Sequence, residues 1–261
     1  MIEAYIRAAA IARGIDPDIA VRVAKAEGGL SDPTRRAEYS KGGAREPSYQ
    51  PPSRDIWGPS KNSLLYIQDT TLRVTANGYA VHMKHADVQQ AVCDFANYFY
   101  SLLTSYAEKG RYPVNSALEI RVTALDDPSK VGVAHAESSV ISALSMDALA
   151  VQNGWDVALW LDVLTIPGTP FCNEFYVDLE TWILKRFSGT AARTLPEWSK
   201  GWAYTADKGP WTNTQFFDHI RKTFTDGRDA QSNWAFEVTT LQKYDRSNLF
   251  SSPLLDQLFR P

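Results

Sequence analysis

Two stretches of the chain alternate apolar and polar residues with a period of two, and this pattern limits the fold more than any other feature. The first stretch is residues 114–123, in which three aliphatic residues alternate with three polar ones: Leu118, Ile120 and Val122 with Glu119, Arg121 and Thr123. Side chains alternate between the two faces of a strand. The stretch therefore predicts a strand with one apolar face and one charged face.

The second stretch, residues 155–165, alternates in the same way, but its polar face includes a large aromatic side chain. One face has five apolar residues, and the other has Asp156, Ala158, Trp160 and Asp162. A solvent-facing strand rarely carries a Trp, whereas ligand pockets are mostly apolar with a few placed polar groups. This second pattern favours the wall of a pocket.

Helical periodicity appears in four further segments. Residues 86–108 place apolar side chains at helical spacing, and Gly110 ends the run. Residues 172–187 predict a second long helix, and residues 212–224 and 229–243 predict two shorter ones.

Three more segments predict strands, at residues 72–83, 138–145 and 197–205. The first is either a hairpin that turns at Asn77-Gly78, a dipeptide suited to positive φ, or one kinked strand. The order β, α, β, β, α, β predicts an α+β fold. Its antiparallel sheet carries the two long helices on one face, in the split βαβ or ferredoxin-like arrangement.

The N-terminal part differs in composition from the rest. Residues 2–13 show helical periodicity, and Asp16 or Asp18 can cap a second short helix that ends near Lys25. Glycine, proline, serine and arginine dominate residues 28–63, which show no apolar period. We divide the chain into a short helical segment, a linker and a main domain: 1–49, 50–63 and 64–261.

Charge and length exclude several classes of partner. A formal net charge of −3 and a pI near 5.8 argue against nucleic acid and anionic membranes. No apolar run reaches membrane-spanning length, and charged residues interrupt the apolar start, so we expect a cytoplasmic protein as encoded. Cys93 and Cys172 lack CxxC spacing, and we interpret them as buried thiols.

Glu119 and Arg121 are the first candidates for chemistry. Two residues apart on one strand face, they lie about 7 Å from each other, close enough to couple. The plain alternative is a surface ion pair with little energetic weight. If the pair lies in a sheltered site with Trp160 and Asp162, its burial requires mutual compensation of the charges, which indicates a functional role.

The stretch EWSKGW supplies a second candidate group, with Glu197 and Lys200 as acid and base beside Trp198 and Trp202. On a regular strand the two charges point to opposite faces, so a bulge or turn is needed to bring them together. The alternative is again ordinary surface.

Other catalytic patterns are missing from the sequence. The four histidines lack HExxH or comparable ligand spacing, which argues against a metal site: His82, His85, His135 and His219. There is no GxSxG, GxGxxG or GxxxxGK[ST] motif. The sequence therefore shows no cofactor loop of its own.

Four motifs together resemble one known family. They are YPVNSALEIRVTALDDP, WDVALWLDVLTIPGTPFCNEFYVDLETW, LPEWSKGWAYT and the tail YDRSNLFSSPLLDQLF. In this order they resemble the substrate-binding domain of cholesterol oxidase type flavoproteins with covalently attached FAD, from about Tyr66 to the C-terminus. The resemblance implies the substrate domain of a vanillyl-alcohol-oxidase-type flavoprotein.

In that family a separate domain holds FAD through a histidine, and the substrate domain covers the flavin. The resemblance implies oxidation of a 3β-hydroxysteroid or other apolar alcohol, with O2 reduced to hydrogen peroxide. Glu119 and Arg121 match the family's Glu-x-Arg pair near the flavin, which is thought to gate oxygen. Glu197 and Lys200 match further charged residues of the active site. The tryptophans 160, 198 and 202 would line the substrate site.

Two departures from the family pattern are visible. Asp162 stands where the cholesterol oxidase form has Asn, and an acid there can titrate together with Arg121 or Lys200. Ser251 and Ser252 stand where related tails have Thr-Asn. The first departure puts strict cholesterol specificity in question.

Residues 1–49 resemble the start of a phage lysozyme or lytic transglycosylase-like domain, in which Glu27 matches the catalytic acid. Such an acid needs a sugar-binding cleft, and the resemblance stops at Tyr49. We interpret this part as a truncated lysozyme-like segment and Glu27 as an exposed helix residue.

Three functions follow from these patterns. The first is the substrate-binding portion of an FAD-dependent sterol or alcohol oxidase, inactive without a flavin domain that another polypeptide would supply. The second is a catalytically silent sterol-binding module. The third is a peptidoglycan hydrolase fragment that depends on Glu27.

Overall fold

The computed structural model describes residues 73–259 and, before them, residues 7, 8, 10–12, 14, 16–18 and 21. The chain divides into two compact units, Met1–Val74 and Thr75–Pro261. Glu27 and the linker predicted at 50–63 lie outside the described residues.

In the first unit, the described residues support the helix predicted at 2–13. Residues 7, 8, 10 and 11 are helical. Asp16 Oδ1 accepts a hydrogen bond from the backbone N–H of Asp18, as expected of a residue that caps a following helix. Arg7 Nη1 lies 2.6 Å from Asp18 Oδ1.

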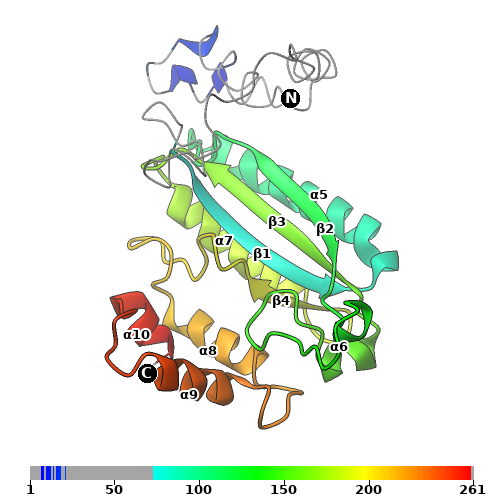
Figure 1. Cartoon of the computed structure of the whole chain (residues 1–261). Coiled ribbons are helices and arrows are strands. Elements are labelled where there is room, and N and C mark those ends of the chain that lie inside the picture. The colour runs from blue at the N-terminus through cyan, green and yellow to red at the C-terminus, as the bar shows by residue number, and fades with distance from the viewer. Residues whose placement is uncertain are drawn as a thin grey trace, which may run out of the picture. The chain divides into compact units, whose positions relative to one another are not determined.

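Apart from one short helix, α6, between its second and third strands, the second unit begins with the predicted order β, α, β, β, α, β, and it ends in a set of helices (Figure 1). Its main elements are β1 (Thr75–Met83), α5 (Val88–Ala107), β2 (Leu118–Ala124), α6 (Ala148–Asn153), β3 (Val157–Thr165), α7 (Cys172–Arg186), β4 (Ala192–Pro196), α8 (Thr214–Thr223), α9 (Trp234–Tyr244) and α10 (Pro253–Phe259). Two short 3-10 helices, η2 (His85–Asp87) and η3 (Pro128–Lys130), lie in the connections.

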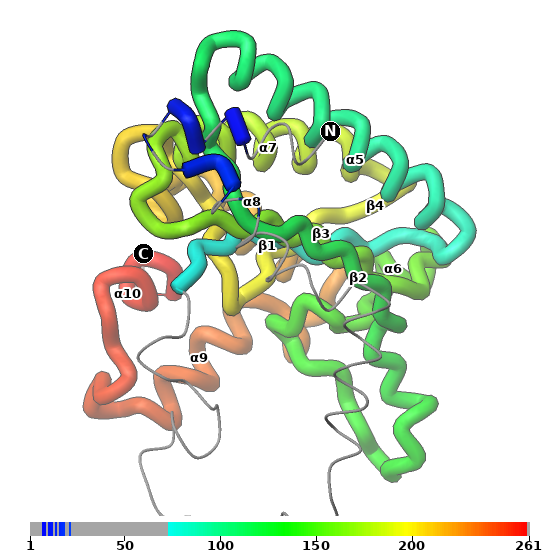
Figure 2. Tube along the Cα trace, turned by 90° about the horizontal axis from the view of Figure 1, so that it is seen from above, coloured from blue at the N-terminus to red at the C-terminus, as the bar shows by residue number. Residues whose placement is uncertain are grey.

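The four strands form one antiparallel sheet in the order β2-β3-β1-β4. α5 and α7 cover one face of this sheet, and α9 and α10 lie on the other side (Figure 2). The split βαβ arrangement predicted from the sequence is confirmed. β3 and β1 are central, so nearly all of their side chains are buried.

The core lies between the sheet and the two long helices. Val81 and Leu159 of the central strands, and Phe95 and Phe175 of the helices, are fully buried. The rings of Tyr98 on α5 and Trp182 on α7 stack with their centroids 4.3 Å apart. Burial of apolar side chains from both layers supplies most of the free energy that holds the helices on the sheet.

The strand predicted at 138–145 is wrong, because this segment is irregular. Three of its carbonyl groups accept hydrogen bonds from side chains in distant parts of the fold: Val140 O from Arg228, Ile141 O from Trp198 and Ala143 O from His82. Its backbone pairing is limited to an isolated bridge between Asp126 and Ser145. β1 and β2 already occupy both edges of β3. The segment therefore lies against the sheet without joining it.

The strand predicted at 197–205 is also wrong in position, because the fourth strand, β4, ends at Pro196. Residues 197–200 instead form a turn closed by a 2.9 Å hydrogen bond from Lys200 N to Glu197 O. On the outer edge of β4, Thr194 O accepts a hydrogen bond from the His219 ring of α8. This contact covers part of an edge that could otherwise pair with another chain.

Three smaller points complete the comparison with the sequence. Residues 75–83 form one strand, so the hairpin alternative at Asn77-Gly78 is wrong. Cys93 is exposed and Cys172 is half-buried, so the prediction of buried thiols is wrong for Cys93. In the described part of the chain, no helix is long and apolar enough to cross a membrane, and no cluster of side chains is suited to a metal ion.

Candidate functional site

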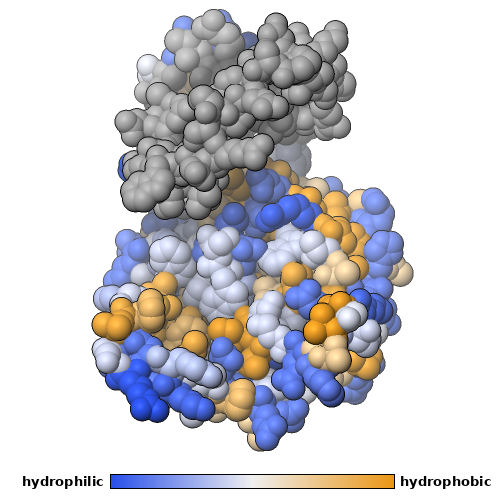
Figure 3. Space-filling model, in the orientation of Figure 1, coloured by the Kyte–Doolittle hydropathy of each residue, from blue (hydrophilic) through white to orange (hydrophobic). Residues whose placement is uncertain are grey.

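The register of the sheet places four predicted site residues on its second face, the one that α5 and α7 leave open. Glu119 lies opposite Asp162, and Arg121 lies opposite Trp160. We call this surface the polar face. In the orientation of Figure 1, polar and weakly polar residues cover much of the surface of this unit, with apolar patches between them (Figure 3).

An ion pair between neighbouring strands forms the centre of the polar face. Arg121 Nη2 donates a hydrogen bond to Asp162 Oδ2. The Arg121 side chain is 52% exposed, whereas that of Asp162 is fully buried. The guanidinium also lies 5.9 Å from the centre of the Trp160 ring, in a cation–π arrangement.

Glu119 does not take part in this ion pair. Glu119 is exposed, and among the described residues it makes no ion pair within 4 Å. Asp162 lies opposite Glu119 and is therefore diagonal to Arg121, at about 7 to 8 Å, a separation similar to the roughly 7 Å between positions i and i+2 of one strand. Arg121 bonds to this buried acid on the next strand, in place of the coupling with Glu119 that the spacing predicts.

The second carboxylate oxygen of Asp162 has no hydrogen-bond partner in the part of the chain that the structure describes. Gly78 of β1 lies opposite, and a Cβ at Gly78 would be 2.4 Å from Asp162 Oδ1 and 2.7 Å from Lys200 Cγ. Loss of hydration raises the pKa of Asp162, although Arg121 opposes this. The site thus contains a buried acceptor with free capacity.

The turn at 197–200 places Glu197 and Lys200, the second pair of candidate residues, in different surroundings. Lys200 lies with its aliphatic stem across Gly78, beside Asp162. Glu197 turns back on its own loop, and its Oε1 accepts a 2.6 Å hydrogen bond from Ser199 Oγ. The structure therefore brings Lys200 to Asp162, while Glu197 influences the site only through its charge.

The three tryptophans occupy two different environments. Trp160 is half-buried on the polar face, and its indole N–H donates to Thr123 Oγ1 at 2.9 Å. Trp198 and Trp202 pack edge to face, 5.6 Å apart, within an aromatic cluster that includes Phe216, Phe217 and Phe224. Only Trp160 directly adjoins the Arg121–Asp162 pair.

Glu180 is an ionisable group that the sequence analysis missed. It is 3% exposed on α7 and accepts hydrogen bonds from Ala203 N at 2.7 Å, Tyr204 N at 3.3 Å and Tyr79 OH at 2.5 Å. Burial raises the pKa of Glu180 to about 7, although the three donors lower it. Its position in the buried stripe of α7, next to Leu179, is the signal that could have identified it.

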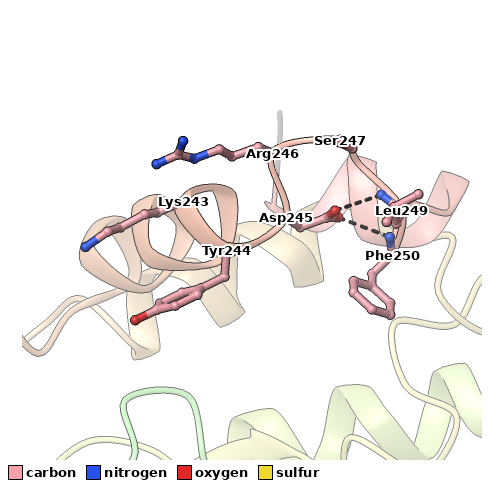
Figure 4. Close-up of a pocket in the computed structure, with 7 residues that line it drawn as sticks. All are labelled: Lys243, Tyr244, Asp245, Arg246, Ser247, Leu249 and Phe250. Atoms are coloured by element: carbon pink, nitrogen blue, oxygen red, sulfur yellow. Dashed lines mark hydrogen bonds between the residues drawn. The ribbon is translucent and has the colours of Figure 1, made fainter.

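An open pocket of about 420 Å³ lies elsewhere, at the end of α9 (Figure 4). Tyr244, Leu249 and Phe250 line it, and Asp245 accepts hydrogen bonds from the backbone N–H groups of Leu249 and Phe250. None of the predicted site residues lines this pocket.

Comparison with known proteins agrees with the motifs and the topology. The family model described as "Cholesterol oxidase, substrate-binding" matches residues 34–260. This chain belongs to that family. The match begins 32 residues before Tyr66, where the four motifs first suggest it, and it includes the candidate residues of the polar face and of the turn at 197–200.

Among solved structures, a solvent-stable cholesterol oxidase is 40% identical, with a TM-score of 0.71, over 93% of this chain and 45% of its own length. The cholesterol oxidase of B. sterolicum is 33% identical, with a TM-score of 0.68, over 74% of this chain and 35% of its own. The chain thus spans less than half the length of these cholesterol oxidases. No curated protein matches it.

Proposed function

We propose that this chain binds a 3β-hydroxysteroid, or another apolar alcohol, as the substrate-binding portion of an FAD-dependent oxidase. The observation that carries the proposal is the Arg121–Asp162 pair beside Trp160. A sterol has a large apolar body with one hydroxyl group, and the polar face offers an aromatic surface beside charged hydrogen-bonding groups. The free oxygen of Asp162 can accept a hydrogen bond from the hydroxyl once Lys200 moves aside.

The described residues form no FAD site of their own that the geometry shows. Of the four histidines, His82 is fully buried with both ring nitrogens bonded, His219 is bonded to Thr194, and His85 and His135 are exposed but do not line the pocket described above. The sequence also lacks a glycine-rich phosphate-binding loop. The polar face suits a surface that covers a flavin held by another domain, where the flavin would supply the redox chemistry.

Sterol binding tests the substrate half of the proposal. The full chain should bind a fluorescent 3β-hydroxysteroid, and Trp160→Ala should weaken this binding about tenfold, because it removes aromatic surface worth roughly 1.4 kcal/mol. Trp211→Ala is the matched control, since Trp211 is 39% exposed before α8 and lies outside the proposed site. Equal losses in the two variants, or no binding by the wild type, would contradict the proposal.

Flavin content and turnover separate the proposed function from a silent sterol-binding module. We expect the purified chain to be colourless and to form no hydrogen peroxide from sterol. A separately produced flavin domain of a cholesterol oxidase should restore peroxide formation if the chain is the substrate half of an oxidase. Sterol binding without restored turnover would favour a silent sterol-binding module.

A further inference from the structure

A buried cluster of charged side chains fastens residues 126–147 to the sheet. We call this segment, which connects β2 to α6, the strap. Asp147, at the end of the strap, pairs with Arg193 of β4 at 2.7 Å and with Arg228, which follows α8, at 3.2 Å. All three side chains are at most 10% exposed. The strap is thus tied both to the sheet and to the C-terminal helices.

His82 of β1 completes the cluster and is fully buried. Its Nδ1 lies 3.1 Å from Arg193 Nη2, and its Nε2 lies 2.8 Å from Ala143 O of the strap. A guanidinium can only donate and a carbonyl can only accept. Nδ1 must therefore accept and Nε2 must carry the proton, so the bonding pattern requires a neutral imidazole.

Protonation of His82 would break this pattern. A second ring proton on Nδ1 would point at the N–H donors of Arg193, and the bond between them would be lost. Among the described residues, the charged groups that face the ring are Arg193, Arg228 and Asp147, so one acid would then oppose three cations. Burial and these cations lower the pKa of His82 from 6.5 to about 4.

We propose that His82 is a proton-operated latch that holds the strap on the polar side of the sheet and releases it when its imidazole becomes charged. Release would also free Trp198, because its indole N–H donates to Ile141 O of the strap at 2.7 Å. The latch involves none of the residues assigned to sterol binding through Arg121 and Asp162. It therefore does not depend on the proposed function.

The size of the pH effect on strap release follows from the protonation of His82 in the latched and in the released state. With an ordinary histidine pKa of 6.5 in the released state and about 4 in the latched state, lowering the pH from 7.5 to 5.5 favours release about tenfold. Release exposes backbone amides of the strap to solvent, which hydrogen exchange detects as a fall in protection.

The experiment measures hydrogen exchange of the full chain at pH 7.5 and 5.5, corrected for the intrinsic pH dependence of exchange. Protection of residues 138–147 should fall about tenfold in the wild type and stay constant in His82→Gln, which keeps an acceptor and a donor but cannot gain a proton. His219→Gln is the control, because His219 is also largely buried but bonds to Thr194, outside the strap. It should show the wild-type fall.

Constant protection in the wild type, or an equal fall in His82→Gln, would overturn the proposal. Peptides that cover 199–206 report separately on the loop held by Glu180, and their protection should not change in parallel with that of the strap. If His82→Gln does not fold, a measurement on the wild type alone still tests the proposal. The indole N–H exchange of Trp198, measured by NMR, should accelerate with the titration of the His82 ring, and independence of the two would refute the latch.

Discussion

Gly78 shows how one residue without a side chain can determine the geometry of a site. It occurs in the middle of β1, where glycine is usually unfavourable. Its missing Cβ leaves the space that the Asp162 carboxylate and the stem of Lys200 occupy. The Asn77-Gly78 dipeptide, which suggests a turn in the sequence, is required here for close approach between neighbouring strands.

We expect Gly78→Ala to destabilise the chain by roughly 1 to 3 kcal/mol, because the new methyl group would overlap Asp162 Oδ1 and Lys200 Cγ. Urea unfolding measures the change. The same substitution in an Asp162→Ala background is the control, since the carboxylate that it meets is then gone. An equal penalty in both backgrounds would show that the Lys200 stem or the backbone, and not the Asp162 carboxylate, sets the cost.

At the scale of elements, Glu180 links helix α7 to a loop and to the central strand β1. It extends from α7 to the backbone of Ala203 and Tyr204, and Ala203 adopts a left-handed φ of 56°. Asn77 Nδ2 donates to Tyr79 OH at 2.8 Å, and that hydroxyl donates in turn to Glu180. This chain of bonds holds the loop that follows Lys200.

Glu180 should make the stability of the chain depend on pH. Its folded pKa of about 7 is above the value of 4.5 expected in the unfolded chain, so its contribution is complete below pH 4.5 and is lost as pH rises through 7. The loss is about 3 kcal/mol by pH 8. Glu180→Gln should remove it, as measured by urea unfolding at several pH values.

His82 changes the stability of the chain in the opposite direction over an overlapping pH range. Its folded pKa is lowered, so its contribution is complete above pH 6.5 and is lost as pH falls toward 4. The wild type should therefore show a shallow pH profile in which the two effects offset each other. A profile of Glu180→Gln that matches the wild type would contradict the assignment of the carboxyl.

At the scale of the whole molecule, Asp147 joins parts of the chain that lie far apart in the sequence. It caps α6 by accepting from Ala150 N, and it pairs with cations from β4 and from the segment after α8. The adjacent cations stack on aromatic rings, Arg193 on Trp155 and Arg228 on Phe224. The sheet, the strap and the C-terminal helices are thus connected by one buried group of ion pairs.

Asp147→Asn should cost about 3 to 5 kcal/mol in the free energy of unfolding, because it leaves two buried guanidinium groups without a compensating charge. Chemical unfolding at pH 7 measures the loss. Asp94→Asn is the matched control, since it removes an acid that pairs with Arg186 on the exposed side of the helices. The midpoint of the control should stay close to that of the wild type.

The sequence by itself determined the elements whose pattern is local. The alternation at 114–123 and 155–165 predicted β2, β3 and the side chains on each face, and helical spacing predicted α5 and α7. These assignments hold because side-chain direction follows from backbone geometry within a few residues. For the same reason, the sequence predicted that Arg121 lies on the polar side of its strand and that Trp160 and Asp162 share one side of theirs.

Only the tertiary structure decided which groups pair and which segments join the sheet. Arg121 bonds to Asp162, 41 residues away, and His82 bonds to Arg193, 111 residues away. Residues 138–145 look like a strand but are held by side chains, and α10, at the chain's end, has no predicted counterpart. Such choices depend on distances between remote residues, which a local pattern does not contain.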